Sequence, residues 1–285
     1  MTADLPGALR QLFRRLFPAT VRRRLWDRYG RRYFERTSLR AISRHVDVNI
    51  TDPTDSVRRL VRLLRENRYR VDHRRITRET GLEFKGFSNQ DLIAYLYFNG
   101  RSTGFFLDIG AFDGLEISNT WALEQLGWDG ICIEPVPEIF ARLSANRGCH
   151  LVNAALARES GHAAPFLKVS GQLGLSGLAR QMPARIRDGL DQQGLDVETI
   201  QVDTVTFDEV MQNHPAVMQI DFLSIDVEGG ELDVLESIDF QRYRFGLITI
   251  ENNAGRARLR DFLGRQGYVL FIDLGVDLMF VPAGS

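Results

Sequence analysis

The segment Phe105–Gly114, FFLDIGAFDG, constrains the fold of this chain more than any other. Its first half is apolar apart from Asp108 and predicts a short buried strand, followed by a glycine turn and a helix from about Glu116. We expect Gly110 and Gly114 to let the backbone come close to a ligand, because glycine has no Cβ. A strand, a glycine turn and a helix form the nucleotide-binding opening of a doubly wound α/β sheet.

The turn differs from the dinucleotide fingerprint G-x-G-x-x-G, because it reads D-x-G-x-x-x-G with Asp108 on the strand. A carboxylate facing the turn would repel a pyrophosphate, which disfavours an NAD-dependent oxidoreductase. It would suit a ligand with an amino group, a sulfonium and no phosphate, such as S-adenosylmethionine. Glu134 follows the next apolar run, 20 residues after Gly114, where a carboxylate is placed to accept hydrogen bonds from ribose hydroxyls.

The rest of the chain alternates between strand and helix patterns, which predicts a mostly parallel α/β sheet with an antiparallel C-terminal hairpin around Gly275. A segment with many glycines, residues 160–200, predicts a long mobile insertion that would cover the substrate. The expected strands are residues 130–134, 149–155, 220–226 and 245–251; the expected helices are residues 90–99, 116–126, 137–146, 206–213, 231–237 and 256–266.

The positive charge is concentrated at the N-terminus. Residues 1–80 hold 21 Arg, no Lys and 9 acidic residues, although the whole chain has a net charge of −1. We therefore expect a basic helical extension over residues 1–80 and a catalytic domain over residues 81–285. The extension would pack on the acidic domain or on a second subunit as a homodimer, dock on an anionic membrane, or bind nucleic acid; the mixture of apolar and basic residues makes nucleic acid the least favoured.

Two further features bear on the cellular setting. No apolar run approaches the roughly 20 residues needed to span a bilayer, and the N-terminus lacks the apolar core of a signal peptide, so we expect a cytoplasmic protein with peripheral membrane contact at most. Cys132 and Cys149 fall in neighbouring expected strands, and we expect both to be buried and reduced.

Four segments together carry a resemblance to a known family. They occur in family order over about residues 87–281, and the S-N-T after the glycine turn and the D-V-E-G-G-E block are the most specific. The chain resembles the FkbM family of S-adenosylmethionine-dependent O-methyltransferases, which implies the class I methyltransferase fold. FSNQDL departs slightly from a family block that more often reads S-Q-x-G/E-D-L. The segments are FSNQDLIAYLYF, GFFLDIGAFDGLEISNTWALEQLGWDGICIEPVPEIFARLSANR, VDTVTFDEV and IDFLSIDVEGGELDVLESIDF.

The resemblance implies which residues hold the cofactor. The glycine turn would form the methionine side of the pocket, Ser118 and Asn119 would reach the methionine carboxylate, and Glu134 with Pro135 would meet the ribose. Asn153 and Ala154 would border the adenine. The turn residues are Asp108, Gly110, Ala111, Phe112, Asp113 and Gly114.

The expected chemistry is centred on acids at strand ends. Asp226 and Glu251 end adjacent parallel strands, where side chains face the ligand crevice, and Glu228 follows Asp226 closely. A carboxylate there would accept the proton of an acceptor hydroxyl. Alternatively Asp226, Glu251 and Asn252 would bind Mg²⁺ through oxygen ligands, an arrangement similar to that of catechol O-methyltransferases. His214 precedes a proline at a helix end and is expected to be structural.

Two functions remain open at this stage. The first is an O-methyltransferase acting on a hydroxyl of a sugar, glycan or related polar metabolite, since acids around the pocket disfavour a phosphate-rich acceptor. The second is a non-catalytic methyltransferase-like protein that is recruited to a membrane or a partner through its Arg-rich N-terminus.

Overall fold

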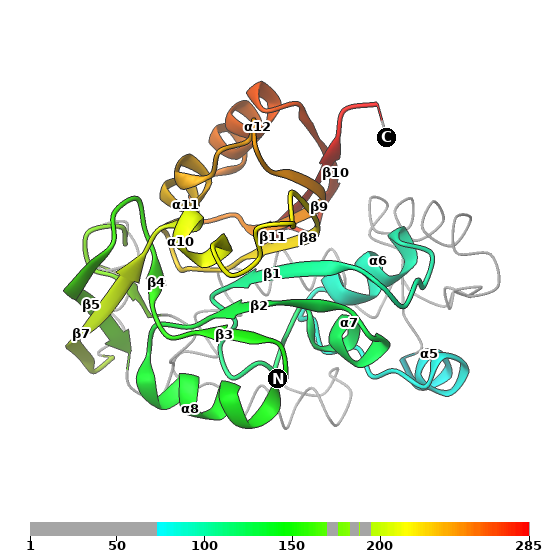
Figure 1. The fold of residues 1–285 in the computed structure, drawn as a ribbon, viewed down its shortest axis with the longest axis horizontal. Coiled ribbons are helices and arrows are strands. Elements are labelled where there is room, and N and C mark those ends of the chain that lie inside the picture. Colours follow the sequence, from blue (N-terminus) through cyan, green and yellow to red (C-terminus); the bar gives the residue numbers. More distant parts are fainter. Residues whose placement is uncertain (1–72, 170–175, 183–187, 189–194, 285) are drawn as a thin grey trace, which may run out of the picture.

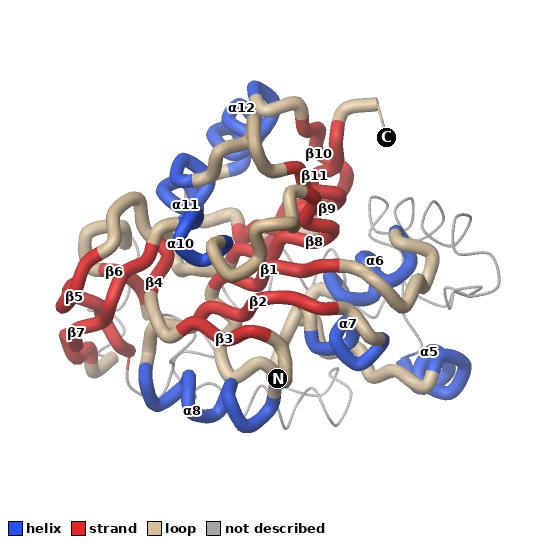
Figure 2. The backbone as a smooth tube through the Cα atoms, in the orientation of Figure 1, coloured by secondary structure: helices blue, strands red, loops and turns tan. Residues whose placement is uncertain are grey.

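The protein is represented by a computed structural model that describes residues 73–169, 176–182, 188 and 195–284. The basic helices expected within residues 1–72 lie outside the described residues. The described part contains a seven-stranded sheet covered by helices on both faces and a separate four-stranded sheet (Figures 1 and 2).

The large sheet has the strand order β10-β11-β9-β8-β1-β2-β3. Strands β3, β2, β1, β8 and β9 are parallel, and the order reverses direction between β1 and β8, which makes this pair the switch point of a doubly wound sheet. The strands are β1 (Phe105–Ile109), β2 (Asp129–Ile133), β3 (His150–Val152), β8 (Gln219–Ile225), β9 (Arg244–Glu251), β10 (Tyr268–Asp273) and β11 (Asp277–Pro282).

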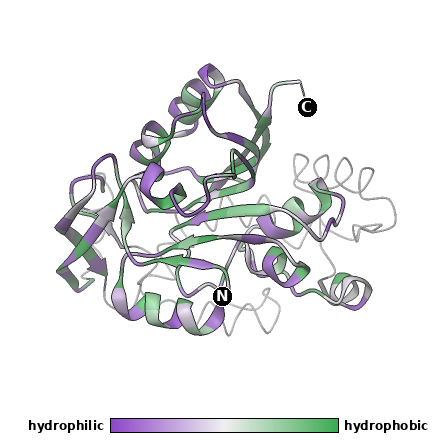
Figure 3. Ribbon diagram, viewed as in Figure 1, coloured by the Kyte–Doolittle hydropathy of each residue, from purple (hydrophilic) through white to green (hydrophobic). Residues whose placement is uncertain are grey.

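Alternate residues of the strands point into two hydrophobic cores, one on each face of the large sheet. Phe105, Leu107 and Ile109 of β1 pack with α10 (Phe207–Met211), α11 (Glu231–Ser237) and α12 (Arg256–Arg265) on one face. Phe106 lies in the core of the other face, which is covered by α6 (Gln90–Tyr97), α7 (Trp121–Leu126) and α8 (Pro137–Asn146). Because both faces are buried, the strands are mostly apolar, and Figure 3 shows their green ribbons between helices with purple outer faces.

The C-terminal hairpin, β10 and β11, completes the large sheet. β11 runs antiparallel to β9 and inserts between β9 and β10, so β10 is the edge strand. This confirms the predicted mostly parallel sheet, with the antiparallel strand one place in from the edge.

Three local expectations need correction. The segment 149–155 is not one strand: β3 ends at Val152 and β4 (Ala155–Leu156) belongs to the second sheet. The helix expected from Glu116 begins at Trp121, since residues before it form a turn. Helix α5 (His73–Thr80), before the first of the helices expected in the catalytic domain, was not predicted from the sequence.

The insertion expected at residues 160–200 contains regular structure. Strands β5 (Gly161–Val169), β6 (Gly177–Leu178) and β7 (Val197–Val205) join β4 in the order β4-β7-β5-β6. Phe166 of β5 and Val202 of β7 are buried and point into a small core of their own. This sheet follows β3 directly in the chain and so lies at the carboxyl end of the parallel strands (Figure 1). Within the described residues, no helix combines the length and apolar character that crossing a bilayer requires.

Candidate active site

A cavity of about 680 Å³ opens at the carboxyl ends of the parallel strands. Such a volume is typical of small-molecule sites. Its walls come from the turn after β1, the ends of β2, β8 and β9, the start of β11 and the second sheet, which contributes Phe166 and Leu178; Gln181, in the turn after β6, also lines it. Of the predicted site residues, those that line it are Asp108, Gly110, Ala111, Phe112, Asp113, Ser118, Asn119, Glu134, Pro135, Ala154, Asp226, Glu228 and Glu251.

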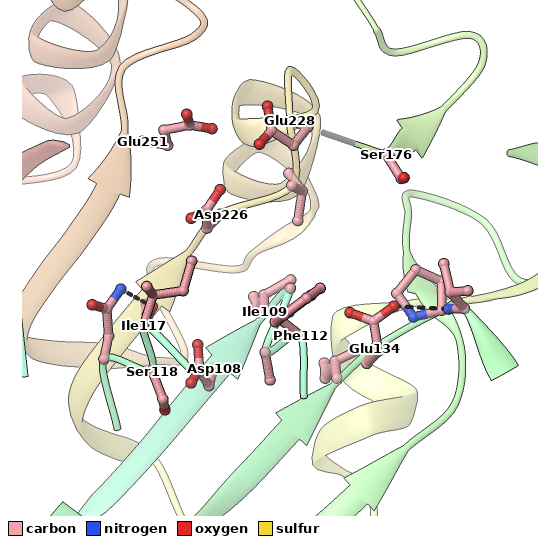
Figure 4. Close-up of a pocket in the computed structure, with 18 of the residues that line it drawn as sticks. Asp108, Ile109, Phe112, Ile117, Ser118, Glu134, Ser176, Asp226, Glu228 and Glu251 are labelled. Carbon is pink, nitrogen blue, oxygen red and sulfur yellow. Dashed lines mark hydrogen bonds between the residues drawn. The ribbon is translucent and has the colours of Figure 1, made fainter. Parts of the chain in front are cut away.

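Three carboxylates converge at one end of this cavity. Asp226 follows β8, Glu251 ends β9, and Glu228 lies in the turn before α11. One oxygen from each lies within 4.8 Å of the others. Figure 4 shows these three side chains gathered together, with Glu134 apart from them on the far side of Phe112. We call Asp226, Glu228 and Glu251 the acid trio.

Proximity and burial disturb the ionisation of the acid trio. Burial raises the pKa of Asp226 to about 6, with a contribution from the negative charge of Asp108. Burial and the neighbouring carboxylates raise the pKa values of Glu228 and Glu251 well above their ordinary range. A hydrogen bond between Asp226 and Glu251 lowers the pKa of the first and raises that of the second. Asp226 is therefore the member that ionises first and the better placed proton acceptor.

A side-chain amide and a backbone N–H donate hydrogen bonds to Glu251 of the acid trio and to the neighbouring Glu231. The side-chain amide of Asn253 donates to Glu251 and, at 3.3 Å, to Glu231. Glu231 is fully buried and also accepts from the backbone N–H of Gly229 at 2.7 Å. No lysine or arginine lines this end of the cavity among the described residues; the one cationic side chain in the cavity wall that the structure describes is the exposed Arg142 of α8.

Glu134 occupies the other end of the cavity, as the end of β2 requires. It is 6% exposed, and its Oε1 accepts the backbone N–H of Val136 at 2.8 Å. Burial raises its pKa to about 8. Asn153 is exposed and lies outside the cavity wall; its amide donates to the carbonyl oxygens of Glu134 and Pro135 at 2.8 and 3.1 Å, so it fixes the turn that carries Glu134.

Asp108 lies between the two ends and is tied down by a hydroxyl. Thr120 Oγ1 donates to Asp108 Oδ2 at 2.6 Å. Burial raises the pKa of Asp108, opposed by this hydrogen bond, by the charge of Arg147 and by Ser224. Asn119 donates to Ser224 Oγ at 3.2 Å, while its Oδ1 is buried without a protein partner. The acceptor oxygen of Asn119 is thus left for a donor in the cavity.

Gly110 and Gly114 allow the turn to pack closely against other segments of the chain. A Cβ on Gly110 would lie 1.8 Å from the carbonyl oxygen of Asp226, and one on Gly114 would lie 2.5 Å from Leu143 Cδ1. Both have positive φ, 83° and 73°. The expectation that they allow close approach of a ligand is therefore wrong for Gly114, which does not line the cavity. For Gly110 the close approach is to the backbone that carries Asp226.

Three residues without glycine's freedom also have positive φ in the cavity wall: Phe112 (53°), Ile117 (54°) and Glu228 (55°). A left-handed conformation costs a bulky or β-branched side chain about 1–3 kcal/mol and persists only where surrounding contacts impose it. Strain of this kind gathers at binding and catalytic sites. Ile117 is also 40% exposed, so its side chain forms part of the cavity mouth.

Arg147, at the end of α8, holds the glycine turn in place through hydrogen bonds, a role that was not expected from the sequence. It is 6% exposed and forms an ion pair with Glu124. Its other nitrogens donate to Gly114 O and Ser118 Oγ at 3.3 Å and to Thr120 Oγ1 at 3.1 Å. A buried guanidinium with several acceptors holds a loop firmly, since each unmade bond would leave a buried charge unsatisfied.

Two further residues considered from the sequence, the predicted metal ligand Asn252 and the predicted structural residue His214, lie outside the site. Asn252 does not line the cavity; its backbone N–H donates to Val276 O at 2.7 Å and its side-chain oxygen is buried without a partner. Glu228 takes the place beside Asp226 and Glu251 that we gave to Asn252. His214 pairs with His150 at 3.0 Å and contacts Phe105, where β1 starts, so it lies at the opposite end of the strand from the cavity.

The part of the cavity wall that Gln90 and Asp277 form next to the acid trio was also not predicted from the sequence. Gln90 Nε2 donates to Asp277 Oδ2 at 2.7 Å, and Asp277 pairs in register with Glu251. Burial raises the pKa of Asp277 to about 8. No local pattern links Gln90 with a residue 187 positions away. Ser224 had a signal, because it lies two residues before Asp226 on the same side of β8.

These buried acids predict an inverted pH dependence of stability. Glu134, Asp277 and Glu231 have folded pKa values of about 8, 8 and 7, above those of the unfolded chain. The folded state therefore binds more protons, and stability is lost as the pH rises towards 8. We expect the free energy of unfolding in urea to fall by at least about 1.4 kcal/mol from pH 6.5 to pH 8. Glu134→Gln should flatten this slope; a slope that rises with pH would contradict the assignment.

Comparison with known proteins identifies the family of this chain. The model of the methyltransferase FkbM domain matches residues 108–270, from the aspartate of β1 to β10. A solved structure, described as the METTL16 MTase domain, is 13% identical and covers 83% of this chain and 82% of its own, with a TM-score of 0.39. No curated protein matches the sequence. Since the family model spans more than half of the chain, including the glycine turn, Glu134 and the acid trio, the protein belongs to the FkbM methyltransferase family.

Proposed function

We propose that the protein is an S-adenosylmethionine-dependent O-methyltransferase that acts on a hydroxyl of a sugar, a glycan or a related polar metabolite. The observation that carries the proposal is the acid trio at the strand ends, in one cavity with Asp108 and Glu134. Membership of a methyltransferase family implies the methyl donor. The oxygen-rich, cation-poor acidic end is what suits a hydroxyl acceptor.

The cavity fits the proposed donor in its charge and its hydrogen-bonding groups. Glu134 directly follows β2, the strand after the glycine turn, where its carboxyl group can accept from ribose hydroxyls. Asp108 supplies a carboxylate next to the turn, and the unpartnered oxygen of Asn119 can accept from an ammonium group. When bound, S-adenosylmethionine supplies a methyl group already activated by its sulfonium.

The chain's own residues then have to orient and deprotonate the acceptor. Alignment of a hydroxyl with a bound methyl group supplies much of the rate enhancement in such transfers. We assign Asp226 as the general base, because its hydrogen bond with Glu251 leaves it the more easily ionised partner. Glu251 and Glu228 would accept hydrogen bonds from neighbouring hydroxyls of a polyol, and Asp277, held by Gln90, would extend this surface.

A divalent cation is the second route to the same chemistry. The acid trio, rather than the set with Asn252, offers three carboxylate oxygens within 4.8 Å of one another, which suits a hard cation such as Mg²⁺. Such an ion would lower the pKa of a coordinated hydroxyl. We expect activity that survives exhaustive treatment with EDTA if Asp226 is the base; loss on chelation and recovery with Mg²⁺ would assign the metal route.

Binding and product analysis test the proposed function directly. Isothermal titration calorimetry should show one S-adenosylmethionine bound per chain, weakened at least about tenfold by Glu134→Ala, since the ribose would lose the carboxyl group that it hydrogen-bonds. Methyl-labelled donor should then be offered with a panel of neutral sugars, oligosaccharides and alcohols. Mass spectrometry should place the label on oxygen. Binding without transfer to any member, or labelling of nitrogen only, would overturn the O-methyltransferase assignment.

A further inference from the structure

Two free thiols lie in contact beneath the glycine turn. Cys132 in β2 is fully buried, and Cys149, just before β3, is half-buried. Their sulfurs are 3.6 Å apart, and both side chains belong to the core that also contains Leu143 of α8. The S–S bond of a disulfide is about 2.05 Å, so the sulfurs need to approach by only about 1.5 Å to become bonded.

Cys149 is hydrogen-bonded through its backbone to Glu124, the ion-pair partner of Arg147. One oxygen of Glu124 accepts the backbone N–H groups of Gly148 and Cys149 at 2.7 and 2.9 Å. The other oxygen of the same carboxylate pairs with Arg147. A displacement at Cys149 therefore acts directly on the ion pair between Glu124 and Arg147.

From Arg147 the contacts continue into the cofactor side of the cavity. Its guanidinium donates to Gly114 O, Ser118 Oγ and Thr120 Oγ1. Thr120 in turn donates to Asp108, which lines the cavity together with Ser118. An unbroken series of hydrogen bonds thus links the thiol pair to the turn where the proposed donor binds.

We propose that Cys132 and Cys149 form an oxidant-sensitive site whose disulfide weakens binding of S-adenosylmethionine through Glu124 and Arg147. The proposal rests on the proposed function only for the identity of this ligand. With hydrogen peroxide as oxidant, the Cys149 sulfur attacks one peroxide oxygen, the O–O bond breaks, and Cys149 sulfenic acid and one water are formed. The Cys132 sulfur then attacks the Cys149 sulfur, the S–O bond breaks, and a second water leaves as the disulfide forms. Two thiols are oxidised while one peroxide is reduced to two waters.

The surroundings determine the order of these steps. Cys149 is half-buried, whereas Cys132 is fully buried, and burial raises the pKa of Cys132 well above its ordinary value despite the nearby Arg147. Cys132 is therefore shielded from peroxide, and it reacts as the resolving thiol with the adjacent sulfenic acid of Cys149. Cys132 is fixed within β2, which has neighbours on both sides, while Cys149 precedes a three-residue strand. Most of the movement that closes the bond should fall on Cys149, the residue attached to Glu124.

The experiment oxidises the full-length protein with stoichiometric hydrogen peroxide, without donor, and then removes the peroxide. We expect thiol titration to fall from two free thiols per chain to none, and intact mass to fall by two hydrogen atoms in a monomeric species. Calorimetry should show about tenfold weaker binding of S-adenosylmethionine, a typical size for coupling between sites, and dithiothreitol should restore it. Added oxygen atoms in place of lost hydrogens, an intermolecular disulfide, or a disulfide-containing protein that binds as tightly as the reduced one would each overturn the proposal.

Two variants separate this site from the binding function itself. Cys149→Ser should bind the donor as the reduced protein does and become insensitive to peroxide. Arg147→Met should bind more weakly when reduced but show no further loss on oxidation, since the link is cut; circular dichroism would confirm that it folds. If Arg147→Met loses the same factor on oxidation, the route through Arg147 is wrong. If the reduced protein binds no donor while its thiols still pair, the proposed function fails instead.

Discussion

Asp226→Asn should lower the rate of methyl transfer by about a hundredfold or more while donor affinity changes little. Asparagine is nearly isosteric with aspartate but cannot take up the proton of an acceptor hydroxyl at neutral pH. The effect should appear in kcat, since the lost interaction forms as the proton is transferred. Glu251→Gln should show a smaller loss, because Glu251 modulates Asp226 through their shared hydrogen bond.

The matched control is Glu116→Gln, which removes an acid from the exposed mouth of the same cavity. It should retain transfer within about threefold, since a solvent-exposed charge interacts weakly with a distant group. The pH profile adds a second readout: the wild-type rate should rise with ionisation of a group with a pKa of about 6, and Asp226→Asn should abolish that limb. A full rate for Asp226→Asn would remove Asp226 as the base.

The largest loss of stability is expected from Gly110→Ala. The added Cβ would lie 1.8 Å from the carbonyl oxygen of Asp226, and φ at this position is 83°. A backbone oxygen in a paired strand end cannot rotate away, and the residue would also be strained in the left-handed region. We expect about 3 kcal/mol or more of destabilisation in urea unfolding, with loss of donor binding even where the variant remains folded.

Gly264→Ala provides the matched control for this change. Gly264 lies in α12, and a Cβ there would meet nothing within 4 Å. Because alanine favours a helix over glycine by about 0.5–1 kcal/mol, this variant should be as stable as the wild type or slightly more stable. A Gly110→Ala protein with the stability of Gly264→Ala would show that β1 and β8 do not approach each other at the turn as described.

The sequence predicted the features that depend on local pattern. The strands before Asp226 and Glu251 are apolar runs of the right length, and α11 lies at residues 231–237 as expected. Parallel strands that end side by side bring their terminal side chains together, which is why the acid pair could be expected once the fold was inferred. Glu134 follows the same logic, since a turn and a helix separate it from the glycine turn by a predictable length.

Features that depend on distant contacts could not be predicted. An arginine at a helix end usually faces solvent, so nothing in the sequence marked Arg147 as buried among Glu124, Ser118 and Thr120. The run 149–155 reads as one apolar strand, but the chain leaves the large sheet at Asn153, whose amide bonds to the β2 turn. The glycines of residues 160–200 suggested irregular structure, although those in the described strands occupy exposed or closely packed positions of a second sheet.

A crystal structure of the protein with S-adenosylhomocysteine tests the central claim most directly. The account predicts the ribose hydroxyls on the Glu134 carboxylate, the amino group near Asn119 and Asp108, and the sulfur facing the acid trio. A nucleoside bound elsewhere, or bound in the cavity with its sulfur turned away from Asp226, would contradict the assignment of this site.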